Sequence, residues 1–86
     1  MQYILSKRFE KDFTKLPKTT KNKAIASLEI FIENPQKARL RNHALQGKWK
    51  RHFSINITSD TRALYFRVDN YLVRFVAIGS HSERYG

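Results

Sequence analysis

The N-terminal third of the chain carries apolar residues at helical spacing. Residues 2–5 form a short apolar run that predicts a strand. Ser6 can cap a following helix, because its hydroxyl can accept a backbone N–H bond. Phe9, Phe13 and Leu16 then lie at i, i+4 and i+7, on one helical face. Pro17 marks a boundary, since a proline disfavours helical geometry in the residue before it.

A second helix is predicted after Pro17, and Asn34-Pro35 ends it. Its apolar positions are the strongest periodic signal in the chain and comprise Ala24, Ile25, Leu28, Phe31 and Ile32.

From Trp49 the period shortens from 3.6 residues to 2, which predicts a half-buried strand over residues 49–57. The side chains expected to meet the helices are Phe53, Ile55 and Ile57, and those expected in solvent are His52, Ser54 and Asn56. Residues 58–61 have turn chemistry and residues 62–68 predict the next strand. Asp69-Asn70 suits a tight hairpin before a last strand over residues 71–78.

The predicted order is therefore β-α-α-β-β-β. It describes an α+β fold in which two N-terminal helices pack on one face of an antiparallel sheet. The opposite face would be wet and lined by basic and hydrogen-bonding side chains. Such a face is a reasonable platform for nucleic acid.

Composition narrows the class of protein. The 86 residues allow one domain, spanning residues 1–86, and contain no cysteine for a disulfide or a thiolate metal site. Seventeen Lys and Arg against seven Asp and Glu give a net charge of +10, which favours a polyanionic partner: nucleic acid, anionic membrane or an acidic protein. No apolar run approaches the roughly 20 residues of a membrane span, and no signal-peptide pattern begins the chain. We expect a soluble, intracellular protein.

Three histidines are the main candidates for chemistry. His43, His52 and His81 lack neighbouring Cys, Asp or Glu at metal-ligand spacing, so we expect no metal site. Each histidine is either an acid–base group or a solvated side chain. Asp60 is either the residue that closes its own turn or a reactive carboxylate, and Arg62 is either surface filler or a phosphate fork.

Trp49 and Tyr85 have weaker local signals. A lone Trp opening an amphipathic strand could stack a base but is more often a core residue. Tyr85 lies close to the C-terminus, and its position alone predicts no role.

Three segments together resemble one known family. Residues 43–50, with the letters HALQGKWK, resemble the H-x-L-x-G-x-W motif of the YafQ branch of RelE/ParE superfamily toxins from type II toxin–antitoxin systems. Residues 59–65 resemble that branch's turn and following strand, and residues 79–85 resemble its G-T-H-x-x-x-F/Y ending. The resemblance covers essentially the whole chain.

The resemblance implies a ribosome-dependent endoribonuclease, which cleaves mRNA without a metal or cofactor and inhibits translation. The catalytic residues that it implies are His43, Asp60, Arg62, His81 and Tyr85. The substrate-binding residues that it implies are Lys48, Lys50, His52, Asn56 and Arg84. His81 would serve as the acid, and either His43 or Asp60 as the base.

The resemblance also implies partners: a cognate acidic antitoxin, the ribosome with its mRNA, and operator DNA only through the toxin–antitoxin complex. It implies a cytoplasmic location and no membrane contact.

One departure from the family pattern matters, because Asn56 stands where the YafQ-like pattern has a histidine. Asparagine exchanges no proton near neutral pH. An alternative is therefore a degenerate or ParE-like module that binds an antitoxin without cleaving RNA, and a further one is a general single-strand RNA-binding domain.

Overall fold

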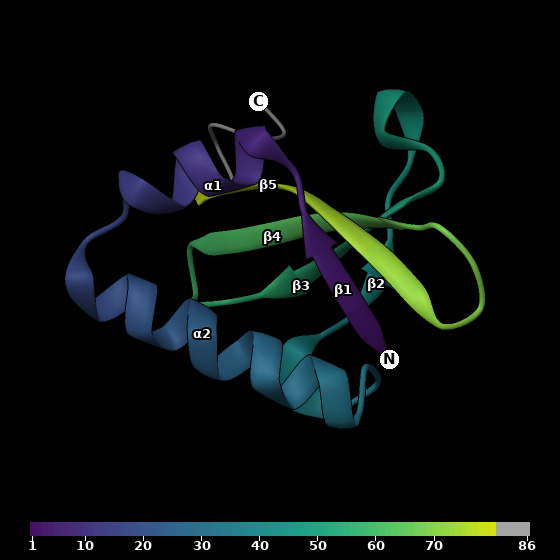
Figure 1. Cartoon of the computed structure of the whole chain (residues 1–86), viewed down its shortest axis with the longest axis horizontal. Helices are drawn as coiled ribbons and strands as arrows, with labels where there is room; N and C mark the ends of the chain where they lie inside the picture. The colour runs from purple at the N-terminus through teal and green to yellow at the C-terminus, as the bar shows by residue number, and fades with distance from the viewer. Residues whose placement is uncertain (81–86) are drawn as a thin grey trace.

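Two helices and a five-stranded sheet form the part of the chain that the computed structural model describes, residues 1–80 (Figure 1). In chain order the elements are β1 (Gln2–Leu5), α1 (Lys7–Thr14), α2 (Lys18–Glu33), the 3-10 turn η1 (Ala38–Leu40), β2 (His43–Ala44), the 3-10 turn η2 (Gly47–Trp49), β3 (His52–Asn56), β4 (Thr61–Arg67) and β5 (Leu72–Ser80). The predicted α+β class is confirmed.

The predicted start of the first helix and both ends of the second are confirmed, whereas α1 ends at Thr14, before the predicted Leu16. Ser6 is the N-cap of α1, and its Oγ accepts the Phe9 N–H at 3.0 Å. Pro17 precedes α2, and α2 stops before Asn34, which is extended at φ −152°. Within residues 1–80, no helix has the length and hydropathy needed to cross a lipid bilayer.

The sheet has the strand order β1-β5-β4-β3-β2, and it is mixed rather than antiparallel. β3, β4 and β5 form the predicted antiparallel meander, whereas β1 lies parallel to β5, with Gln2 opposite Leu72 and Leu5 opposite Phe75. A short turn forces antiparallel pairing, but β1 and β5 are joined through the rest of the chain, so no turn constrains their direction.

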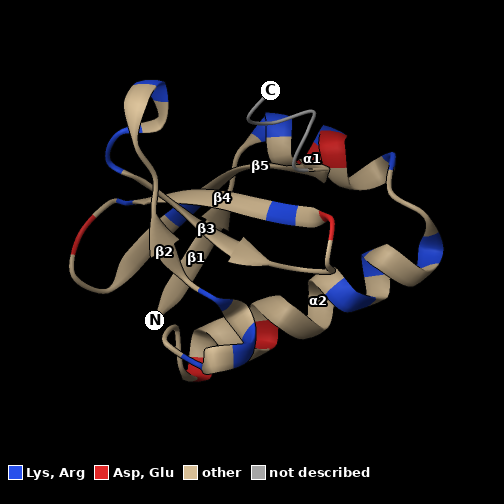
Figure 2. Ribbon diagram, turned by 180° about the vertical axis from the view of Figure 1, so that it is seen from behind, with Lys and Arg blue, Asp and Glu red and all other residues tan. Residues whose placement is uncertain are grey.

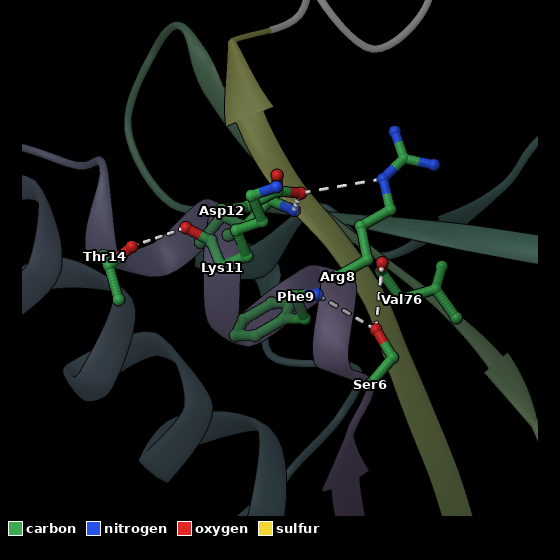
Figure 3. Close-up of polar contacts among 8 residues, drawn as sticks. Ser6, Arg8, Phe9, Lys11, Asp12, Thr14 and Val76 are labelled. Carbon is green, nitrogen blue, oxygen red and sulfur yellow. Dashed lines mark hydrogen bonds and ion pairs between the residues drawn. The ribbon is translucent and has the colours of Figure 1, made fainter.

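The edge of β5 is paired with β1 as far as Phe75, and beyond that residue it lies against the α1 region. The register of β5 shifts beside Val76, just after β1 ends opposite Phe75. The Ser6 Oγ donates to the Val76 carbonyl at 3.1 Å, and Asp12 Oδ2 accepts the Ile78 N–H at 3.3 Å (Figure 3). Two side chains of the α1 region therefore satisfy backbone groups that a neighbouring strand would otherwise pair.

The main core lies between the sheet and the helices. The Phe31 ring of α2 meets the rings of Tyr65 and Phe75 edge-on, at centroid distances of 5.1 and 5.3 Å. Phe9 of α1 lies 5.8 Å from the same Phe75 ring. Both helices thus share one core, and α2 runs across one face of the sheet (Figure 1).

Two details of the predicted third strand were wrong. Trp49 belongs to η2 and the strand begins at His52, because Arg51 adopts a left-handed φ of 73° that interrupts an extended chain. Ser54 is fully buried instead of facing solvent. It shares its face with Leu64 and Ala77 of the neighbouring strands, both also at 0% exposure, so the centre of the expected polar face is closed.

Candidate functional site

Polar residues gather where β3, the β3–β4 turn and β4 meet. Asn56 of β3 lies directly opposite Arg62 of β4, and Arg62 lies opposite Gly79 of β5. Opposite residues share one face of a sheet, with Cβ atoms about 4.5–5.5 Å apart. Ser80, the last residue of β5, pairs with Thr61. The described part of the sheet therefore ends beside the turn that carries Asp60.

The β3–β4 turn is closed by Thr58, a residue that the sequence did not single out. Its Oγ1 accepts the N–H groups of Asp60 at 3.2 Å and of Thr61 at 2.9 Å. Asp60 is exposed, and within residues 1–80 no hydrogen bond engages its carboxylate. The prediction that Asp60 closes its own turn is wrong, because the Thr58 hydroxyl, and not the Asp60 carboxylate, accepts the backbone N–H groups of the turn.

Arg62 is anchored to the same turn. Its Nη1 donates to the carbonyl oxygens of Thr58 at 2.9 Å, Ser59 at 3.1 Å and Thr61 at 3.3 Å. A guanidinium has five N–H donors, and the described contacts use Nη1 alone. The Nε and Nη2 groups of this half-buried arginine are therefore left for an anion.

His43 is held in one orientation on the short edge strand β2. Its Nδ1 lies 2.8 Å from the carbonyl oxygen of Arg41, a residue with a left-handed φ of 47°. Because a carbonyl oxygen only accepts, this contact places the ring proton on Nδ1. The Nε2 of the neutral ring then has a free lone pair, which is what a general base needs.

His43 shares the sheet face with Asn56 and Arg62. It pairs with Ser54, which lies two residues before Asn56 on β3. Diagonal neighbours on adjacent strands lie about 7–8 Å apart, and two strand spacings are about 10 Å. His43 therefore lies diagonally across β3 from Arg62, about 12 Å away by these spacings, with Asn56 between them and Asp60 at the adjoining turn.

The remaining predicted residues fall in two places. His52 begins β3, four residues or about 13 Å from Asn56, and its Nδ1 lies 3.2 Å from the Lys50 carbonyl oxygen. Lys48 and Lys50 are exposed in and after η2. His81, Arg84 and Tyr85 lie outside the described residues.

Two further residues fix the chain that leads into β2. The Tyr65 hydroxyl donates to Asn42 Oδ1 at 2.9 Å, and Asn42 Nδ2 donates to the Pro35 carbonyl at 3.0 Å. Burial raises the pKa of Tyr65, although the bond to Asn42 and the charge of Arg67 act in the opposite direction. Sequence reasoning missed this pair because no local pattern links residues 23 positions apart.

The side chains of residues 1–80 include no group of three or more His, Asp or Glu placed to hold a metal ion. The acid–base inventory of the described site consists of His43 and Asp60, with Arg62 as the adjoining cation.

Sequence comparison assigns the family. The family described as "Bacterial toxin of type II toxin-antitoxin system, YafQ" matches residues 1–85. The chain belongs to this YafQ toxin family. The resemblance drawn from the motifs at residues 43–50, 59–65 and 79–85 is thereby confirmed, and the protein is a toxin of a type II toxin–antitoxin system.

Solved structures agree with membership of the YafQ family. YafQ from Escherichia coli BL21(DE3) is 27% identical with a TM-score of 0.82, over 99% of this chain and 98% of that one. A conserved Helicobacter pylori protein solved in solution is 29% identical with a TM-score of 0.73, over 95% and 96% of the two chains. The toxin in the E. coli DinJ–YafQ toxin–antitoxin complex is 27% identical with a TM-score of 0.79, over 99% and 97%. No curated protein matches the sequence.

Proposed function

We propose that this YafQ-family toxin is a ribosome-dependent endoribonuclease that cleaves mRNA and so inhibits translation. The observation that carries the proposal is the fixed His43 ring, whose Nδ1 contacts the Arg41 carbonyl at 2.8 Å while its Nε2 is left as a base. His43 shares a sheet face with Arg62, whose remaining donors suit a phosphate.

The reaction is a transesterification followed by release. The 2′-oxygen of one nucleotide attacks the adjacent phosphorus as its proton passes to a base. The bond from phosphorus to the 5′-oxygen breaks, and an acid gives that oxygen a proton. The products are a 2′,3′-cyclic phosphate, which water opens to a 3′-phosphate, and a 5′-hydroxyl. Side chains supply both proton transfers and the stabilising charge, so no metal or cofactor enters the scheme.

Each role goes to a named residue. His43 takes the 2′-hydroxyl proton at Nε2, and Asp60 is the alternative base because its carboxylate is exposed at the neighbouring turn. Arg62 stabilises the pentavalent phosphorus through Nε and Nη2. Asn56 positions the substrate by hydrogen bonds. His81 acts as the acid.

The residues near the C-terminus and around η2 complete the assignment. Tyr85 places its ring or hydroxyl at the scissile nucleotide, and Arg84 contacts RNA phosphate. Lys48 and Lys50 contribute exposed positive charge to RNA binding.

The positive charge also accounts for the partners. A net charge of +10 favours ribosomal RNA and mRNA, with affinity that falls as salt rises. It equally favours a small acidic antitoxin that masks the toxin. The E. coli DinJ–YafQ complex pairs a similar toxin with an antitoxin, which supports the same pairing for this chain. Operator DNA would be bound only by the toxin–antitoxin complex.

Primer extension on mRNA from a purified translation system tests the proposal. The wild-type toxin should cut mRNA only when ribosomes are present. His43→Ala and His81→Gln should each slow cleavage about 100-fold or more, the usual size of a general acid–base contribution. Lys18→Gln, an exposed change at the start of α2, is the control and should cleave normally. Full cleavage by His43→Ala would assign the role of general base to Asp60. Full cleavage by both histidine variants would refute the acid–base scheme.

Asn56 favours a second candidate, a toxin fold that binds its antitoxin but has lost cleavage. An amide replaces the histidine of the YafQ-like pattern and exchanges no proton. Tight antitoxin binding together with intact mRNA in the same translation assay would establish this reading.

A further inference from the structure

The sheet face that carries Asn56 and Arg62 has a second polar end. At the start of β3, His52 lies opposite Phe66 of β4, which lies opposite Arg74 of β5. The rings of His52 and Phe66 meet edge-on at 5.7 Å. This row is parallel to the row of Asn56 and Arg62 and about 13 Å from it along β3.

A cavity of about 550 Å³ opens at this second end, within the usual size range of small-ligand pockets. Its lining holds three cations, three rings and no carboxylate: Lys50, Arg51, His52, Phe53, Phe66 and Arg67. The Arg67 guanidinium lies 5.5 Å from the centre of the Phe53 ring. Lys and Arg also mark the loop around η2, beside this end of the sheet, in the view from behind (Figure 2).

Trp49 gives this end an unused hydrogen-bond donor. Its ring meets the His52 ring edge-on at 5.3 Å. Its Nε1 is buried and has no hydrogen-bond partner within residues 1–80. A buried indole N–H usually finds a partner, and Trp49 does not itself line the cavity, so this donor would be satisfied by a change of position when a ligand binds.

We propose that this aromatic–basic pocket binds one nucleotide of single-stranded RNA, neighbouring the nucleotide whose phosphate is cleaved. The base packs against Phe66 and His52, and Lys50 and Arg51 contact its phosphate. The inference rests on the proposed function, because the second polar row then places a different nucleotide of the same strand. The toxin would then hold its substrate at two places, the row of Asn56 and Arg62 and the end of the sheet at His52 and Phe66.

The fully buried row between the two ends supports this arrangement. Ser54, Leu64 and Ala77 separate Asn56 from His52 without an exposed side chain. This row is covered, so any contact with RNA is confined to the two ends. An acidic peptide would be satisfied by the cations alone, whereas the rings of His52 and Phe66 are what a base stacks on.

Trp49 provides the assay, because it is the only tryptophan in the chain and lies against His52. The probe is a 2′-O-methyl tetraadenylate, which cannot be cleaved because it lacks the nucleophile. An abasic tetranucleotide with the same phosphates separates stacking from charge. Saturable change of Trp49 emission with the tetraadenylate, and at least tenfold weaker binding of the abasic probe, are expected.

Two variants divide the contributions. Phe66→Leu should weaken tetraadenylate binding about tenfold, the size of one base–aromatic stack, and leave abasic binding unchanged. Lys50→Gln, at an exposed position, should weaken both probes and lower the salt slope by about 0.7. Tyr71→Leu removes an equally large ring from the β4–β5 hairpin, where it is 78% exposed, and should change neither.

The outcomes separate this inference from the proposed function. Equal binding of both probes, equal binding by wild type and Phe66→Leu, or displacement of the RNA by a polyglutamate peptide at lower concentration would overturn the nucleotide pocket. If mRNA cleavage nevertheless depends on His43, the proposed function stands without it. Base-dependent binding by a toxin that cuts no mRNA would support the pocket and refute the nuclease.

Discussion

The Tyr65 hydroxyl donates a hydrogen bond of 2.9 Å to Asn42 Oδ1, which joins the centre of the sheet to the segment that enters β2. Tyr65 is only 2% exposed and packs against Phe31, whereas His43 follows Asn42 directly and is exposed. A buried aromatic residue thereby fixes the starting point of the strand that carries the proposed base. The core and the site are linked through one side-chain pair.

Tyr65→Phe should lower the free energy of unfolding by about 1 kcal/mol, because it removes this bond and leaves Asn42 Oδ1 without its donor. Urea denaturation at pH 7 measures the loss. Tyr71→Phe, at an exposed hairpin position, is the matched control and should be neutral. A Tyr65→Phe protein as stable as wild type would show that the hydrogen bond adds nothing to the packing of the ring.

The same tyrosine predicts an alkaline limit to stability. Burial raises the pKa of Tyr65 above its ordinary value of about 10. The folded state therefore holds the hydroxyl proton more tightly than the unfolded state does. The stability from this group is fully present below pH 10 and is lost as the pH rises through the folded-state pKa. The stability advantage of wild type over Tyr65→Phe should shrink as the pH rises above 10, and a constant difference would contradict this.

Ser6→Ala should destabilise the fold by about 1–2 kcal/mol, since the hydroxyl both caps α1 and donates to the Val76 carbonyl on the edge of β5. Thr14→Ala is the control, because the Thr14 hydroxyl also bonds a backbone carbonyl but lies at the exposed end of the helix (Figure 3). Thermal unfolding followed by circular dichroism compares the two. Equal melting temperatures for both variants would mean that the edge of β5 does not depend on Ser6.

Local signals explain which parts of the fold could be predicted from the sequence. Ser6, Pro17 and Asn34-Pro35 act on the backbone next to them, and the helix boundaries follow from these residues. The partner of β1 follows from no local pattern, because any apolar strand can pair in either direction once a long connection joins it. β2 spans only His43 and Ala44, too few residues for a period to be read.

In the candidate site too, local motifs identify residues but do not reveal their contacts. The motifs led to His43, Asp60 and Arg62, but their geometry depends on contacts that the sequence does not display. The Arg41 carbonyl orients His43, and the Thr58 hydroxyl closes the turn in place of Asp60. The alternation within β3 predicts Ser54 in solvent, whereas Ser54, Leu64 and Ala77 form a fully buried row across three strands that no single strand's pattern reveals.

Arg62→Lys should test whether charge or geometry matters at the β3–β4 turn. Lysine keeps the charge but has a single ammonium group. It cannot bond the turn carbonyls, as Arg62 Nη1 does, and at the same time donate two hydrogen bonds to a phosphate. We expect cleavage to fall about 10–100-fold, with Arg62→Gln losing more. Primer extension on mRNA from the translation system measures both variants. A fully active Arg62→Lys toxin would show that Arg62 contributes only its positive charge and not its hydrogen-bond geometry.

Asn56 provides the sharpest test of the site, because it lies opposite Arg62 and replaces the histidine of the YafQ-like pattern. If its amide positions the RNA, Asn56→Ala should slow cleavage about tenfold, the value of one hydrogen bond to a charged group. Asn56→His should cleave at least as fast as wild type, since an imidazole offers both a hydrogen bond and proton exchange. Asn56→Asp is the matched control of similar shape, and its negative charge should repel the phosphate and depress cleavage further. An inactive wild type with an active Asn56→His variant would identify the toxin as degenerate, and full activity in Asn56→Ala would remove this residue from the substrate site.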